Sequence, residues 1–234
     1  MEEQFYLLWP LLIFLVPRGK FKQLCLTAIG LGFLFRLGIT LIYRAEAFSF
    51  LLNDPQQAVN VLPFSHLDAF AFGAYISRFS IPNARKQLLY LSFAVPLIGF
   101  ATQFIANGYF EPFLTLGYQV TLPDAYQYIW AYTLLNYWFV VIIYCVAREK
   151  MFVQFLDWPP LQYLGKISYG LYIYHFPLIW IVGLIRDHSF PDAAARPVIL
   201  VGAFVGTVAV ASLSYYMLER PFLKLKDRFA SYLN

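Results

Sequence analysis

Long apolar stretches separated by short charged loops run through the whole 234-residue chain. A helix needs roughly 20 apolar residues to cross a bilayer, and about seven stretches approach that length. They are residues 4–17, 23–43, 64–79, 88–106, 127–147, 166–185 and 197–218. No repeat of fixed period and no low-complexity linker divides them, so we predict a single domain over residues 1–234. The expected fold is all-α, a polytopic bundle of about seven transmembrane helices.

The composition excludes an ordinary soluble protein. Hydrophobic residues make up 60% of the chain and charged residues 13%, whereas soluble domains average about 45–50% and about 25%. The two cysteines, Cys25 and Cys145, form no CxxC pair. With the three histidines on separate stretches, we predict no metal site. The sequence also has no glycine-rich phosphate loop.

The basic residues predict an orientation. If the loop after residues 4–17 is cytoplasmic, the opposite side and the membrane hold only Arg36, Arg44, Arg186 and Arg196, and every other Lys and Arg is cytoplasmic. Cytoplasmic loops of membrane proteins carry this excess. We therefore predict an integral membrane protein with its N-terminus outside and its C-terminus in the cytoplasm. The positive charge indicates anchoring in a lipid bilayer, and no nucleic acid is expected as a partner.

The segment Leu164–Trp180 carries unusual polar residues for an apolar helix. Ser168, Tyr172 and His175 stand at i, i+4 and i+7 and so share one helix face, which should point at protein or water. We expect Pro177 to kink the helix just after the histidine. His175 lies about 14 Å along the helix from Lys166, near mid-membrane. An intramembrane histidine is a functional candidate; the alternative is a core histidine bonded to a tyrosine on another helix.

A second set of polar residues lies in residues 23–43 and 64–79. Burying Arg36 in the membrane costs at least about 2.5–3.5 kcal/mol, so it should pair with a carboxylate or line a polar cavity. Asp68 is one candidate partner, although it lies nearer the outer face, and such a pair is either functional or purely structural. His66 and Asp68 point about 200° apart on a helix and cannot form a dyad by themselves; His66 is alternatively a solvated helix cap.

Small residues suggest one close helix contact. Ala69, Gly73 and Ser77 recur every four residues within 64–79. Such a stripe is typical of tightly packed membrane helices.

Three ordered stretches resemble one family of proteins. They are EEQFYLLWP at residues 2–10, GKISYGLYIYHFPL at 165–178 and ERPF at 219–222. Together they resemble the acyltransferase-3 family of integral membrane acyltransferases. The resemblance implies about ten helices, of which the first motif opens roughly the fourth. We therefore expect three helices, on the order of 100 residues, to be missing before residue 1. The family's best-supported catalytic histidine and its arginine-rich donor motif belong to that missing part.

The resemblance also implies a reaction and roles for residues. Such proteins move an acyl group, usually acetyl, from cytoplasmic acetyl-CoA or another acyl-CoA to a carbohydrate outside, and the membrane is then the bacterial inner membrane. No cofactor is expected to stay bound, because the acyl-CoA is a substrate. The expected catalytic residues are His175 and Glu3. The expected substrate-binding residues are Glu2, Arg36, His66, Asp68 and Tyr172, and Lys166 would attract the phosphates of the donor.

Two alternatives to a complete enzyme stay open. The absent histidine motif favours an inactive remnant, or a fragment that works beside a partner supplying the first helices. The intramembrane Arg36 and His175 would also suit a transporter or flippase for a lipid-linked glycan, although no inverted repeat supports it.

Overall fold

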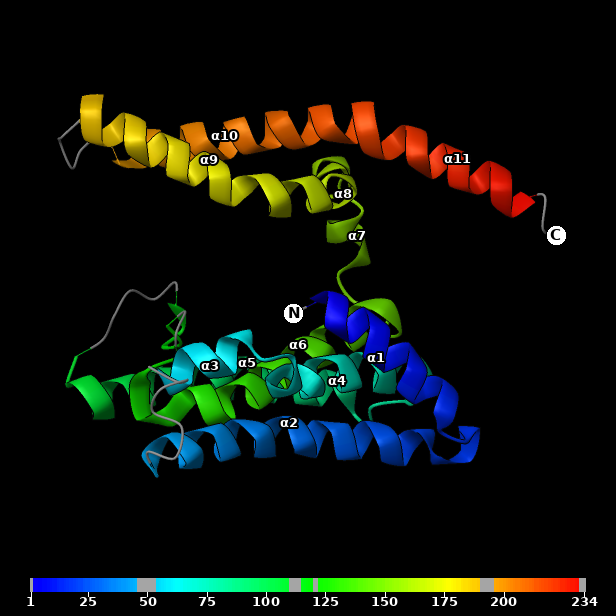
Figure 1. Cartoon of the computed structure of the whole chain (residues 1–234), viewed down its shortest axis with the longest axis vertical. Coiled ribbons are helices and arrows are strands. Elements are labelled where there is room, and N and C mark those ends of the chain that lie inside the picture. Colours follow the sequence, from blue (N-terminus) through cyan, green and yellow to red (C-terminus); the bar gives the residue numbers. More distant parts are fainter. Residues whose placement is uncertain (1, 46–53, 110–114, 120–121, 190–195, 232–234) are drawn as a thin grey trace. The chain divides into compact units, whose positions relative to one another are not determined.

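The computed structural model of the chain describes residues 2–45, 54–109, 115–119, 122–189 and 196–231. They divide into two compact units, Met1–Met151 and Phe152–Asn234 (Figure 1). The described residues are helical or irregular and contain no β-strand, which confirms the all-α prediction. That residues 1–234 form one domain stays a prediction.

The first unit is a helix bundle. Its main helices are α1 (Glu2–Leu15), α2 (Phe21–Arg44), α4 (Leu67–Arg78), α5 (Ala84–Asn107) and α6 (Gln127–Ala147). Shorter turns join them: η1 (Arg18–Lys20), α3 (Pro55–Val61), η2 (Pro63–His66) and η4 (Asp124–Tyr126). Helix α2 packs against α4 and α6, and α6 also packs against α5.

The second unit is built on one long helix pair. Its elements are α7 (Val153–Leu156), α8 (Pro159–Lys166), α9 (Ser168–Ser189), α10 (Arg196–Ser214), the π-helical turn η6 (Tyr215–Glu219) and α11 (Arg220–Ser231). Helices α9 and α10 pack along each other. Gly170 permits their close approach, because a Cβ atom there would lie 3.1 Å from the Cα atom of Ala211.

Four helices of the described residues are long and apolar enough to cross a membrane: Arg18–Arg44, Ala84–Asn107, Asp124–Ala147 and Leu200–Leu225. A fifth span is possible if α8 and α9, which are bent by 72° relative to each other, cross together. The break lies at Ile167, whereas helix α9 continues through Pro177. A sharp bend that the sequence did not predict therefore lies before Ser168, and the kink expected at Pro177 stays a prediction.

Two of the predicted spans are short helices. Helix α1 has 14 residues and α4 has 12, which give lengths of about 21 and 18 Å against a hydrocarbon core of about 30 Å. The predicted count of about seven membrane helices is therefore not confirmed. Physically, α1 ends before Pro17, and Pro63 and the η2 turn delay the start of α4.

The loop before α6 is seated on the middle of α5. Gly117 has φ +76°, a conformation that favours glycine, and a Cβ atom on it would overlap the backbone of Gly99. The Tyr118 hydroxyl donates a hydrogen bond to the Val95 carbonyl at 2.9 Å, and Gln127 Nε2 donates to the Gly117 carbonyl at 2.9 Å. Burial raises the pKa of Tyr118 to about 12, so its hydroxyl stays protonated at neutral pH.

Candidate functional site

A buried ion pair lies at the centre of the first unit. Nη2 of Arg36, on α2, is 2.8 Å from Oδ2 of Asp68, on α4, and both side chains are fully buried. Arg36 is therefore paired with a carboxylate, as one of the two alternatives required, and the candidate Asp68 is that partner. A charge enclosed in this way is tolerated only when it is paired and its remaining polar atoms are hydrogen-bonded.

Further groups bind the guanidinium of Arg36. Its Nε donates to the carbonyl of Ile129 at 2.8 Å, and Nη1 donates to the carbonyl of Ser65. Its Nη2 also donates to the hydroxyl of Thr133, which in turn donates to Oδ2 of Asp68 at 2.6 Å. The arginine therefore joins α2 to η2, α4 and α6.

Both carboxylate oxygens of Asp68 are occupied as well. Besides the two bonds to Oδ2, Oδ1 accepts from the amide of Ala69 at 2.9 Å and from Nδ2 of Asn136 at 3.3 Å. Since the protein itself saturates this carboxylate, we infer that the pair holds α2, η2, α4 and α6 together and does not offer free charge to a substrate.

The approach of α4 to α2 depends on Gly32. This residue stands one turn before Arg36, and a Cβ atom on it would lie 3.0 Å from the amide nitrogen of Asp68. The close contact is thus made by a glycine of α2. The sequence predicts a close helix contact through the small residues of α4. At Gly73 that prediction is wrong, because a Cβ atom there would meet nothing within 4 Å.

His66 borders the ion pair but is partly exposed. Its Nε2 lies 3.4 Å from the carbonyl of Asn60, and the edge of its ring meets Tyr132 at a centroid distance of 5.0 Å. The guanidinium of Arg36 is 5.6 Å from the same tyrosine ring. His66 lies outside the four candidate spans, and burial lowers its pKa below the usual 6.5. It is therefore a neutral imidazole at pH 7, able to accept a proton.

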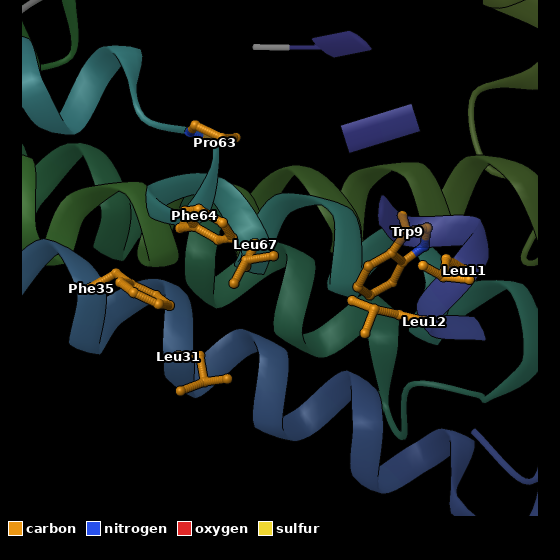
Figure 2. Close-up of a pocket in the computed structure, with 8 residues that line it drawn as sticks. All are labelled: Trp9, Leu11, Leu12, Leu31, Phe35, Pro63, Phe64 and Leu67. Carbon is orange, nitrogen blue, oxygen red and sulfur yellow. The ribbon is translucent and has the colours of Figure 1, made fainter. Parts of the chain in front are cut away.

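The first unit also contains an apolar pocket of about 290 Å³ (Figure 2). Its lining comes from α1, α2 and the η2–α4 segment: Trp9, Leu11, Leu12, Leu31, Phe35, Pro63, Phe64 and Leu67. Phe35 and Phe64, which stack at a centroid distance of 5.4 Å, directly precede Arg36 and Ser65 in the sequence. The lining offers no hydrogen-bonding side chain other than the indole of Trp9, so the pocket suits hydrocarbon and not a sugar or a phosphate.

The second unit presents the other predicted residues on the surface of α9. His175 is exposed, and its Nδ1 lies 3.2 Å from the carbonyl of Leu171 and 2.6 Å from that of Tyr172. The rings of Tyr172 and His175 are 6.0 Å apart, and Tyr172 is also exposed. Ser168, Tyr172 and His175 therefore share one face of α9, as predicted, and this face is exposed within the second unit.

Other predicted residues lie at helix ends. Lys166 is exposed at the last position of α8, just before the bend. Glu2 and Glu3 begin α1, but their side chains lie outside the described residues. Among the described residues, no three His, Cys, Asp or Glu side chains gather into a group that would hold a metal ion.

Sequence reasoning missed three members of the buried cluster: Ser65, Thr133 and Asn136. The last two stand at i and i+3 in α6, so they share one face of an otherwise apolar helix. That polar face was the available signal, and the cluster around Arg36 and Asp68 would have followed from it. Ser65 contributes its carbonyl, which no side-chain pattern reveals.

Comparison with protein families finds one match. The family model described as "Acyltransferase domain", of the acyltransferase-3 type, matches residues 1–216. No solved structure is significantly similar to the chain.

Several curated proteins are also similar to the chain. The peptidoglycan O-acetyltransferase OatA of Listeria monocytogenes is 27% identical over 236 residues, which cover 96% of this chain and 34% of that protein. The O-acetyltransferase OatA of Staphylococcus aureus is 28% identical, covering 96% and 35%. The putative peptidoglycan O-acetyltransferase YrhL of Bacillus subtilis is 25% identical, covering 94% and 33%. The chain thus spans about a third of the length of these relatives.

Proposed function

Because the chain belongs to the acyltransferase-3 family, we propose that it is the membrane part of an O-acetyltransferase that modifies a carbohydrate outside the cell membrane. The match of the family model to residues 1–216 is the observation that carries this proposal. The relatives bear names of O-acetyltransferases, which supports acetyl as the transferred group. The apolar helices support a position in the membrane.

We propose peptidoglycan as the acceptor and acetyl-CoA as the donor. The acceptor follows from the names of the Listeria and Bacillus relatives. A cytoplasmic thioester donor would meet Lys166, whose ammonium group attracts phosphate. In the proposed orientation, Glu2, Glu3 and the region of His66 face the acceptor.

His175 is the proposed proton carrier. A carbonyl oxygen can only accept, so Nδ1 must carry hydrogen where it contacts the carbonyls of Leu171 and Tyr172. The lone pair is then on Nε2, which can take the proton of the acceptor hydroxyl as its oxygen bonds to the acetyl carbon. The carbon–sulfur bond of the thioester breaks, and the imidazolium returns the proton to the leaving thiolate. Glu3 would orient the acceptor, and Tyr172 would pack beside it.

The buried pair has a positioning role in this proposal. Arg36 and Asp68 are enclosed and saturated by protein groups, so they fix α4 and with it His66. Their enclosure also removes one support for a transporter, because Arg36 lines no open passage among the described residues.

The proposal is tested in cells that carry the full-length gene. Replacing His175 with Ala should lower base-labile acetate on purified cell wall by roughly 10²–10⁴-fold, the usual worth of a general acid–base group. The variant should insert into the membrane at the wild-type level. His188→Ala, which removes another histidine of α9, should leave the acetate unchanged.

Different failures point to different errors. If cells with His175→Ala keep the wild-type amount of wall acetate, His175 is not part of the active site. That result would not contradict the proposed O-acetyltransferase function. Unchanged wall acetate after deletion of the gene would overturn peptidoglycan as the acceptor. Loss of the glycan from the surface, with its acetyl content per sugar unchanged, would favour the transporter.

A further inference from the structure

Helix α11 has two chemically different faces. At 100° per residue, positions four apart share a face and positions two apart lie on opposite faces. One face carries three basic positions: Arg220, Lys224 and Arg228. The opposite face carries three apolar positions, Phe222, Leu225 and Phe229, with one base, Lys226, beside them. A helix of this kind, basic on one side and aromatic or aliphatic on the other, suits the boundary between water and lipid.

Among the described residues of the second unit, Phe222 and Leu225 on the apolar face are not buried by a protein partner. Phe222 is 69% exposed and Leu225 is 47% exposed, and Lys224 on the other side is exposed too. The close packing of α11 is with the η6 turn that precedes it. Within the second unit, Figure 1 shows α11 extending past the end of the α9–α10 pair. Large apolar side chains left open in this way indicate an external surface that covers them.

The preceding helix places α11 at the edge of the membrane. The candidate span Leu200–Leu225 has 26 residues and is about 39 Å long, longer than the hydrocarbon core of about 30 Å, so its last residues, in α11, reach the membrane boundary. The η6 turn then brings Tyr215 and Tyr216, a residue type enriched at membrane interfaces. The guanidinium of Arg220 lies 5.8 Å from the ring of Tyr216.

From these observations we propose that α11 binds the surface of an anionic membrane. Phe222 and Leu225 rest at the boundary between headgroups and acyl chains, and the basic face binds the phosphates of anionic phospholipids. Each Lys or Arg near an anionic surface strengthens the association by about fivefold, from an attraction of about 1 kcal/mol. The basic face therefore gives α11 a preference for anionic phospholipids, and the apolar face sets how deeply α11 lies in the membrane.

The test measures the depth of α11 in the full chain, reconstituted in nanodiscs. A spin label is attached to Leu225→Cys or, separately, to Lys224→Cys. The native Cys25 and Cys145 are fully buried, so the reagent selects the introduced thiol. Collision with oxygen, which enters the bilayer, and with a water-soluble nickel chelate then reports depth. The nanodiscs contain phosphatidylcholine alone or with about 30% phosphatidylglycerol.

We expect the label at 225 to be oxygen-accessible in anionic nanodiscs and the label at 224 to meet the nickel chelate. Phosphatidylcholine alone, or high salt that screens the charges, should expose the label at 225. In the background of Leu225→Cys, the changes Arg220→Gln, Lys224→Gln and Arg228→Gln should abolish the preference for the anionic lipid. The matched control neutralises three exposed bases of the first unit, Arg18, Lys20 and Lys22, and should retain that preference.

Other outcomes overturn the proposal. If the label at position 225 collides with the nickel chelate in nanodiscs of either lipid composition, α11 projects into water. A label shielded from both reagents shows a protein partner. A label in the bilayer regardless of lipid charge and salt shows anchoring by the apolar face alone. Because depth is measured without any reaction, these results are independent of the acetyl-transfer assay.

Discussion

The buried charges of Arg36 and Asp68 are compatible with a stable fold only when both are present. Each is fully buried, and an isolated buried charge costs several kcal/mol that the partner and its hydrogen bonds must offset. Thr133 serves both at once, since its hydroxyl accepts from the guanidinium and donates to the carboxylate. Loss of one charge therefore harms more than loss of both.

A double-mutant cycle tests this view. Arg36→Gln and Asp68→Asn should each lower the free energy of unfolding by about 3–5 kcal/mol, since each leaves one unpaired buried charge. The double variant should lose less than the sum of the two. Unfolding is followed in detergent with a thiol-reactive dye, because Cys25 and Cys145 are fully buried in the native state.

The surface ion pair offers the matched comparison. Arg85 and Glu149 are 3.1 Å apart but their side chains are 64% and 36% exposed. Arg85→Gln should therefore change the stability by only about 0–1 kcal/mol. Equal losses at the buried and the exposed pair, or a strictly additive cycle, would refute a special role for Arg36 and Asp68.

At this scale the sequence revealed the charged partners but not the neutral ones. An arginine within an apolar stretch demands a counter-charge, so Asp68 could be predicted. Thr133 and Asn136 share one face of α6, which marks them as a polar face, but a neutral side chain does not demand a counter-charge and so does not name its partner. The carbonyls of Ser65 and Ile129 belong to the backbone, and only the folded chain brings them to the guanidinium.

Among the elements, the contact between α2 and α4 rests on one missing side chain. Gly32→Ala places a methyl group 3.0 Å from the amide nitrogen of Asp68 and should lower the free energy of unfolding by about 1–3 kcal/mol through overpacking. Gly38→Ala, in the same helix with nothing within 4 Å, should leave it unchanged or slightly raise it. The thiol-dye assay measures both. Indistinguishable melting of the two variants would contradict the close contact.

Helix limits followed from the sequence where the apolar stretch was long and uninterrupted. Residues 127–147 coincide with α6, and residues 23–43 and 88–106 lie within α2 and α5. The prediction was less accurate at 4–17 and 64–79, where prolines and a 3₁₀ turn shorten the helices. The break at Ile167 was missed because Pro177 was the more obvious helix breaker.

For the whole molecule, the division into two compact units predicts separate responses to damage. Both cysteines belong to the first unit, so thiol labelling reports on that unit alone. Gly170→Val would crowd Ala211 across the α9–α10 contact and should loosen the second unit. We expect labelling of Cys25 and Cys145 to keep its wild-type rate.

A reporter in the second unit completes that experiment. The half-buried hydroxyl of Ser212 accepts a hydrogen bond from Tyr163 at 2.7 Å, so a thiol in Ser212→Cys should be labelled faster when Gly170→Val is added. Gly183→Val, at an open position of α9, serves as the control. Faster labelling of Cys25 or Cys145 in the Gly170 variant would show that the two units unfold together.

The buried pair also has a consequence for the synthesis and membrane insertion of the protein. Arg36 emerges from the ribosome 32 residues before Asp68 and 97 residues before Thr133. At about 5–20 residues per second, the delay until Thr133 is made is on the order of 5–20 s. During that time α2 carries a charge that disfavours its release into lipid by about 2.5–3.5 kcal/mol. Until these neighbours arrive, Arg36 weakens the preference of α2 for lipid, so the order of synthesis bears on how the chain inserts.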